Sequence, residues 1–157
     1  MNIEIVAVGK IKEEYLRKGI DDYLKRLSRY AKLKVIEIAD EDISQRMPAE
    51  VKAREARKLA KYISPSDSRY VIALDIQGHE ATSEELAEKL ESLMVAGKST
   101  VTFVIGGALG LDESVLNAAD FRLSFSRMTF THQIARFILL EQVYRSFKII
   151  KGEPYHY

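Results

Sequence analysis

The chain has 157 residues, of which 46% are hydrophobic and 30% are charged, and its formal net charge is +1. This size and composition predict a single soluble domain, residues 1–157, with a core of its own. No apolar run approaches the roughly 20 residues that a membrane span needs, and the first residues lack the basic start of a secretory signal. The chain has no cysteine and three histidines, so we expect neither disulfides nor a metal site. The absence of cysteine also suits a reducing compartment, and we expect a cytoplasmic location.

The small net charge hides an uneven distribution. Nine basic residues stand against four acidic ones between Lys10 and Lys34, and six stand against Glu141 alone between Arg122 and Lys151. Such local basic excess suits contact with a polyanion, although solvated helix faces would give the same pattern.

Strand and helix patterns alternate along the chain. Strands are expected at residues 2–8, 33–39, 70–74, 100–105 and 121–124, and helices at 14–30, 48–63, 82–96, 112–118 and 132–147. Thr82 and Glu85 have the spacing of a capping box, and Asp75 with Gly78 closes the third strand. This alternation predicts an α/β fold with a mostly parallel sheet and helices on both faces. Ligands of such sheets bind at the carboxyl ends of the strands.

The last helix carries apolar residues around more than one face, among them Ile134, Phe137, Ile138 and Phe147. A helix that is apolar on two sides has to be buried twice. We therefore predict a self-complementary dimer interface. The open alternative is a central helix that its own chain covers.

The strand at 100–105 runs directly into Gly106-Gly107-Ala108-Leu109-Gly110. Without a Cβ, the glycine backbone can come close to a ligand, and free N–H groups stand at the start of the next helix. A plain strand-to-helix turn would account for the same glycines. Neither a phosphate-binding loop nor a dinucleotide fingerprint is present.

Other candidate groups lie at strand ends and at the terminus. Asp75 ends a strand, a common place for a functional carboxylate, although a turn-making role before Gly78 accounts for it better. No Gly-x-Ser-x-Gly motif supports a hydrolase. The tail Pro154-Tyr155-His156-Tyr157 is suited to stacking on a nucleobase, unless it is simply a frayed end.

Several spaced motifs together resemble a known family. They are Gly106-Gly107-Ala108-Leu109-Gly110-Leu111, Leu123-Ser124-x-Ser126-x-Met128-Thr129-x-x-His132-x-x-x-Arg136, Glu141-Gln142-x-Tyr144-Arg145 and Pro154-Tyr155-His156. In this order they resemble the small SPOUT-class (α/β-knot) methyltransferases, and more narrowly the RlmH-type pseudouridine N3-methyltransferases of the large ribosomal subunit. The likeness spans the whole chain, including the opening strand and Leu74-Asp75-x-x-Gly78.

The resemblance implies a trefoil knot on the C-terminal side and an obligate homodimer that holds S-adenosylmethionine in the knot. The matching cofactor positions are Leu74, Gly106, Gly107, Ser126, Arg127, Met128, Thr129, Phe130 and Thr131. The matching positions on the substrate side are His132, Arg136, Glu141, Arg145, Tyr155 and His156. The tail is expected to reach the partner's pocket. Relatives commonly end with a basic residue where this chain has Tyr157, so a phosphate contact there is in doubt.

The implied activity is S-adenosylmethionine-dependent methylation of N3 of a pseudouridine in helix 69 of 23S rRNA, on the assembled ribosome. The N3 proton has to leave before N3 can attack a methyl group. His156 is the first choice for handling this proton and Asp75 the second. The alternatives are a ribosome- or RNA-binding module without chemistry, and a knot methyltransferase that acts on tRNA. No membrane and no metal are expected as partners.

Overall fold

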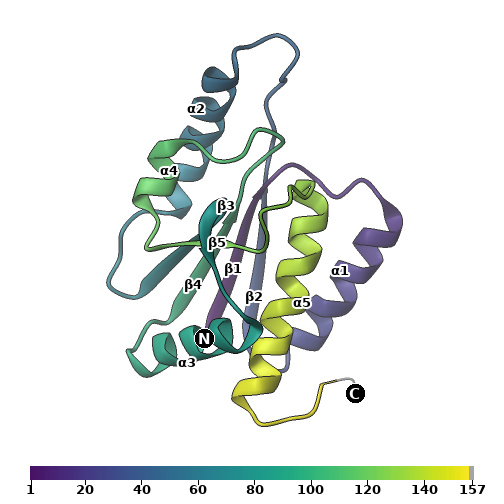
Figure 1. The fold of residues 1–157 in the computed structure, drawn as a ribbon, viewed down its shortest axis with the longest axis vertical. Coiled ribbons are helices and arrows are strands. Elements are labelled where there is room, and N and C mark those ends of the chain that lie inside the picture. The colour runs from purple at the N-terminus through teal and green to yellow at the C-terminus, as the bar shows by residue number, and fades with distance from the viewer. Residues whose placement is uncertain (156–157) are drawn as a thin grey trace.

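The fold is a single parallel sheet between two helical layers (Figure 1). The computed structural model describes residues 1–155. Their elements are β1 (Asn2–Val8), α1 (Glu14–Leu27), β2 (Lys32–Ile38), α2 (Pro48–Leu59), the 3₁₀ turn η1 (Ala60–Tyr62), β3 (Arg69–Glu80), α3 (Ser83–Val95), β4 (Thr100–Ile105), α4 (Glu113–Ala118), β5 (Phe121–Ser124) and α5 (His132–Ile150). The strand order is β2-β1-β4-β3-β5, and each neighbouring pair is parallel.

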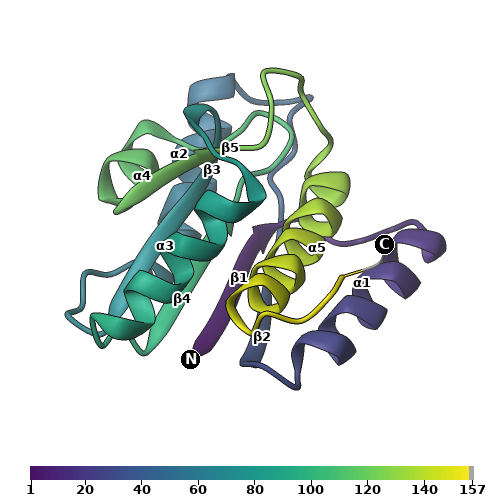
Figure 2. The same ribbon diagram turned by 60° about the horizontal axis from the view of Figure 1, so that its bottom comes forward.

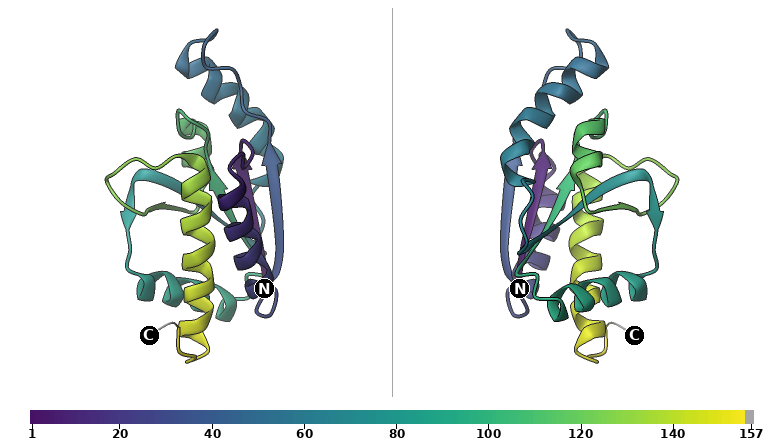
Figure 3. Two further views of the ribbon diagram at one scale, coloured as in Figure 1. Left: turned by 90° about the vertical axis from the view of Figure 1, so that its right-hand side faces the viewer. Right: turned by 90° about the vertical axis from the view of Figure 1, so that its left-hand side faces the viewer.

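Helices cover both faces of the sheet, as the strand–helix alternation predicts. One face packs against α1, α3 and α5, and the other against α2 and α4 (Figures 2 and 3). Neighbouring residues of β1 divide between the two cores: Ile5 joins the first and Val6 the second. Side chains alternate across a strand, so a strand covered on both faces has to be apolar throughout.

The third strand is longer than the sequence indicates. Asp75 and Gly78 were expected to close it, yet β3 continues to Glu80. Its pairing with β4 ends at Ala73, and after an irregularity it pairs again with β5. At Gly78 a Cβ would lie only 2.7 Å from the carbonyl oxygen of Arg122. Glycine therefore allows the close strand approach that extends the pairing, a role that sequence alone does not separate from a turn.

Helix ends follow local rules, with shifts of a few residues. The capping box is confirmed: the Thr82 hydroxyl accepts from the Glu85 amide at 3.1 Å, and the Glu85 carboxylate accepts from the Thr82 amide at 2.8 Å. The first helix ends at Leu27 rather than residue 30, and the last extends to Ile150 rather than residue 147. The second helix gives way to η1 before residue 63.

Helix α5 lies between α1 and α3 on one face of the sheet (Figure 2). Its inner side buries Leu139, Leu140 and Val143, and the flanking helices cover its sides. One chain therefore buries two sides of α5, which is the alternative that the sequence left open. The covers are α1 and α3, with Tyr155 of the tail packed against Tyr144 near the end of α5. The dimer stays a prediction.

Candidate functional site

The glycine turn after β4 folds back on itself. Gly107 and Gly110 form an isolated bridge, and the Gly110 amide donates to the Gly107 carbonyl at 3.1 Å. Gly110 has a φ of +82°, a conformation that glycine adopts without strain. A Cβ on Gly106 would lie 2.7 Å from the carbonyl carbon of Gly110. The first glycine is thus required by the turn itself, in addition to any approach by a ligand.

The second glycine of the pair packs against a buried carboxyl group. A Cβ on Gly107 would lie 3.2 Å from both carboxylate oxygens of Glu55 and from Val8. Glu55 lies on α2, is 4% exposed and accepts a hydrogen bond from the Glu41 amide at 3.1 Å. Burial raises the pKa of Glu55. Glu55 was not among the predicted site residues, because the sequence shows it only as an acidic residue next to the apolar stripe of α2.

A cleft of about 490 Å³ opens at the carboxyl ends of β4 and β5, beside the glycine turn and the middle of β3 where its pairing with β4 has ended. Of the residues predicted to hold a cofactor, seven line it: Leu74, Gly106, Gly107, Ser126, Met128, Thr129 and Phe130. Arg127 and Thr131 belong to the same loop but do not line the cleft. The volume falls within the range of about 300–1,000 Å³ that small-molecule sites occupy.

Both polar and apolar groups surround this cleft. Asp75, Lys52 and Glu113 line it, and the sequence analysis named only Asp75. The Asp75 carboxylate accepts from the Gln77 amide at 3.1 Å, as a turn-making aspartate does. Lys52 lies on α2, and the sequence does not distinguish it from any other basic residue on a helix. The cleft therefore has both acidic and basic side chains around a floor that is formed mainly by backbone atoms.

The loop from Ser124 to Thr131 is held by its own hydroxyl groups. The buried Ser124 hydroxyl donates to the carbonyl of Ile76, at 3.0 Å, or of Ser126, at 3.1 Å. The Ser126 hydroxyl accepts from the Met128 amide at 3.0 Å, and Met128 is 75% exposed. These bonds explain why the loop is rich in hydroxyl residues: they shape backbone that no strand or helix supports.

His132 is the first residue of α5 and lines the cleft. Its ring packs on Gly9, where a Cβ would lie 2.6 Å from Cε1. Burial, together with the positive charge of Arg136, lowers the pKa of His132. Among the described residues, nothing hydrogen-bonds its buried Nδ1 atom. The lowered pKa favours the neutral imidazole, whose ring forms part of the wall of the cleft.

Arg136 lies one turn further along α5 and is 2% exposed. Its Nη1 donates to the Glu37 carboxylate at 2.6 Å, and its Nη2 donates to the Gly9 carbonyl at 3.0 Å. The guanidinium therefore ties α5 to the carboxyl ends of β1 and β2, and it does not line the cleft. A role on the substrate side remains a prediction.

Three further candidates meet near the other end of α5. Arg145 donates to Glu141 through Nε at 3.1 Å and through Nη2 at 2.6 Å. Its guanidinium carbon lies 4.3 Å from the ring centre of Tyr155. The Tyr155 hydroxyl contacts that of Tyr23 at 3.3 Å, and burial, with hydrogen bonds to Tyr23 and Glu141, raises the pKa of Tyr155. These three residues, which the family resemblance assigns to the substrate side, lie together, and we call them the tail cluster: Glu141, Arg145 and Tyr155. Their role on the substrate side stays a prediction.

The tail cluster lies away from the cleft within one chain. Glu141 and Arg145 follow His132 by nine and thirteen residues, which corresponds to about 14 and 20 Å along a helix. His156 and Tyr157 lie outside the described residues, so the prediction for His156 is not tested.

Two negative findings concern the described chain. No helix within residues 1–155 is both long and apolar enough to cross a membrane. In the same range, no three His, Asp or Glu side chains gather as a set that could hold a metal ion.

The fold and the cleft define an α/β protein with a small-molecule site at the strand ends, where a glycine turn meets a hydroxyl-rich loop. A family described as "Predicted SPOUT methyltransferase" matches residues 1–156. The chain belongs to the SPOUT methyltransferase family.

Relatives with curated names cover nearly the whole chain. The "Ribosomal RNA large subunit methyltransferase H" proteins of Acetivibrio thermocellus and Alkaliphilus oremlandii are each 56% identical to it, over 99% of both chains. A solved structure titled "The structure of a probable methylase family protein from Haemophilus influenzae Rd KW20" matches 99% of this chain and 70% of that chain, with a TM-score of 0.57 and 16% identity. At this identity the likeness shows the fold alone.

Proposed function

We propose that this protein transfers a methyl group from S-adenosylmethionine to N3 of a pseudouridine in the RNA of the large ribosomal subunit, as a cytoplasmic homodimer. The observation that carries the proposal is the cleft, since the glycine turn and the hydroxyl-rich loop predicted to hold the cofactor both line it. Identity of 56% over 99% of both chains to proteins named as large-subunit rRNA methyltransferases supports the choice of substrate.

The residues of the cleft fit this cofactor. Its backbone floor at Gly106 and Gly107 and the loop around Ser126 would hold the nucleoside, and apolar contacts from Leu74 and Phe130 suit an adenine ring. The cofactor would supply an activated methyl group on a sulfonium. Family membership also implies that the chain around these two loops is knotted, which would fix their backbone groups before the cofactor binds.

The chemistry then needs alignment and removal of a proton. In-line attack forms the N3–methyl bond as the sulfur–methyl bond breaks, so positioning supplies much of the rate enhancement, on the order of 7–11 kcal/mol. The N3 proton has to pass to a base, for which His156 is the first candidate and Asp75 the second. The neutral imidazole of His132 lies at the same cleft and would orient the base or relay the proton.

A second copy of the chain would complete this site. The tail cluster lies about 14–20 Å along α5 from His132, too far to contact an acceptor in its own cleft. The outward side of α5 carries the half-exposed Ile138 and the exposed Ile149, which suits pairing of two copies. A dimer built on this side would let Arg145 and Tyr155 of one protomer approach the other protomer's cleft.

The test is methyl transfer with labelled S-adenosylmethionine and three RNA substrates: intact ribosomes, free large-subunit RNA and tRNA. The proposal predicts label in the large-subunit RNA, recovered by mass spectrometry of nucleosides as an N3-methylated pseudouridine. Label in tRNA would favour the other substrate class. Cofactor binding without any labelled RNA would indicate a binding module.

A further inference from the structure

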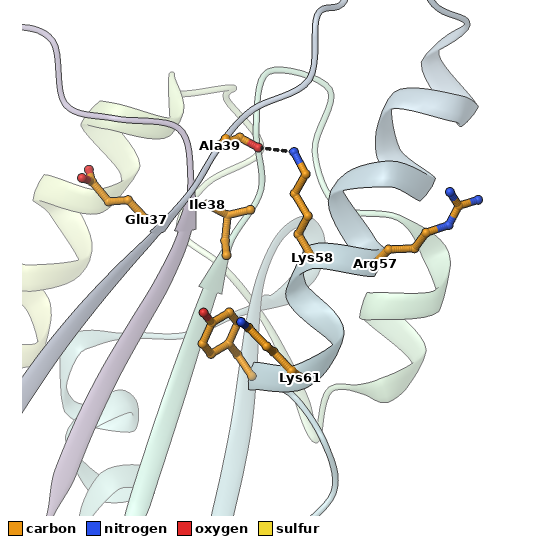
Figure 4. A pocket seen from close by; sticks show the side chains of 7 residues that line it. Glu37, Ile38, Ala39, Arg57, Lys58 and Lys61 are labelled. Carbon is orange, nitrogen blue, oxygen red and sulfur yellow. Dashed lines mark hydrogen bonds between the residues drawn. The ribbon is translucent and has the colours of Figure 1, made fainter.

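A second hollow, of about 380 Å³, lies between the end of β2 and the C-terminal part of α2. Residues 37–39 at the end of β2 form one wall, and Arg57, Lys58, Lys61 and Tyr62 form the other (Figure 4). We call it the α2 groove. Like the cofactor cleft, it lies at the carboxyl end of the sheet and takes part of its lining from α2.

The acidic groups near the α2 groove already have partners. Glu37 points away from the groove (Figure 4), and its carboxylate binds Arg136 at 2.6 Å. Lys58 reaches across the groove to the Ala39 carbonyl at 3.0 Å and pairs with Glu41 at 2.9 Å. The fixed charges of the groove are therefore balanced, apart from two further cations.

Those two cations, Arg57 and Lys61, have no acidic partner within residues 1–155. Both are exposed, and the Arg57 guanidinium extends outward from the rim of the groove (Figure 4). Ala53 stands four positions before Arg57, and Arg57 stands four positions before Lys61, so neither cation has an acid at that spacing.

Some helix cations of this protein are paired: Arg54, Lys18 and Arg26 each bind an acid four residues earlier. The exposed Lys25 of α1 has no acidic partner within residues 1–155 either, so a missing partner does not by itself mark a binding site. The helix dipole favours cations near the end of α2, but it does not require a groove or an aromatic ring beside them. Here the Lys61 ammonium lies 4.9 Å from the ring centre of Tyr62. Unpaired cations beside a half-buried tyrosine combine phosphate binding with a surface for a sugar or base.

We propose that the α2 groove and its rim bind the phosphate backbone of the large-subunit RNA, through Lys61 and Arg57, while the target base enters the cofactor cleft. This inference rests on the proposed function. Lys52 lines the cleft from the same helix, so α2 supplies cations to the cleft and to the groove. An RNA strand crossing this end of the sheet would meet positive charge before and after the reacting nucleotide. The groove would therefore raise substrate affinity and leave the methyl-transfer step unchanged.

The experiment compares Arg57→Gln/Lys61→Gln with wild-type protein by measuring binding to free large-subunit RNA and to ribosomes at several salt concentrations. Each lost phosphate contact lowers the slope of log K against log salt by about 0.9. The double variant should thus lose about 1.8 from the slope, and the fall in affinity between about 50 and 200 mM salt should shrink roughly tenfold. KM for RNA should rise, with kcat and S-adenosylmethionine affinity unchanged.

The matched control is Arg54→Gln, which removes the same charge from the same helix at a position already paired with Glu50. It should leave the salt slope at the wild-type value, whereas Arg57→Lys should restore the slope that Arg57→Gln loses. An unchanged slope in the double variant would overturn the proposal. Weaker binding to ribosomes with unchanged binding to free RNA would also overturn it, and would indicate an acidic protein partner. Failure of the wild-type protein to methylate any RNA would count against the proposed function, while the slopes would still report on the groove.

Discussion

Replacing Arg136 with methionine distinguishes a structural from a substrate-binding arginine. Arg136 is 2% exposed, and its two Nη atoms bind the Glu37 carboxylate and the Gly9 carbonyl. Methionine fills a similar apolar volume but donates no hydrogen bond. Leaving the Gly9 acceptor without its donor costs about 1–3 kcal/mol. The Glu37 side chain is 38% exposed, so solvent screens the ion pair and its loss adds only about 0–1 kcal/mol.

The expected loss of stability for Arg136→Met is therefore about 1–4 kcal/mol, which for a domain of this size lowers Tm by roughly 2–16 °C. Calorimetry and urea unfolding would measure it. Glu37→Gln is the matched control and should lose less than about 1 kcal/mol, because its side chain can still accept from the guanidinium.

A Tm for Arg136→Met within about 1 °C of wild type would refute the stabilising role of the hydrogen bonds that Arg136 donates to Glu37 and Gly9. Methyl transfer measured well below the lower Tm answers the separate question. If Arg136 only stabilises the fold, the folded variant keeps most of its kcat. A loss of kcat beyond the unfolded fraction would instead support the predicted role on the substrate side.

Three further predictions concern the turn, a cap and the pH dependence. Gly106→Ala would force a Cβ to within 2.7 Å of the Gly110 backbone, so S-adenosylmethionine affinity measured by calorimetry should fall at least several-fold; unchanged affinity would remove the turn from the cofactor site. Thr82→Ala breaks the capping box and should cost about 1 kcal/mol in urea unfolding, with Glu85→Ala showing a smaller loss. The pKa of His132 is lowered in the folded state. Above the pKa of the unfolded chain, about 6.5, the imidazole is neutral in both states and does not reduce the free energy of unfolding. As the pH falls below that value, the unfolded chain takes up the proton more readily, and the free energy of unfolding decreases. Wild-type protein should accordingly lose more stability on acidification than His132→Asn, and parallel pH profiles would contradict this assignment.

Elements set by local pattern could be predicted from the sequence. The apolar, β-branched run at Thr100–Ile105 forms β4, and the Thr82–Glu85 spacing forms the expected cap. These features depend on residues close together in the chain, so a short segment of sequence is enough to predict them. The cleft could be placed for a related reason: the carboxyl ends of parallel strands meet at one edge.

Features set by distant contacts could not be predicted. Arg136 binds Glu37 across 99 positions of sequence, and nothing in its helix indicates that it is buried. Similarly, α3 covers one side of α5 through contacts that include a hydrogen bond between residues 59 positions apart in the chain, so the pattern of α5 alone does not show that its own chain buries that side. The extension of β3 past Asp75 depends on the approach of β5 to Gly78, which no local pattern shows.

The central claim is that the cleft beside the glycine turn binds the methyl donor. Titration calorimetry of S-adenosylmethionine into the purified protein tests it most directly. The account predicts saturable binding at one site per protomer, weakened by Gly106→Ala and unaffected by Arg57→Gln/Lys61→Gln. The absence of any saturable heat for folded wild-type protein, or binding that Gly106→Ala leaves intact, would contradict it.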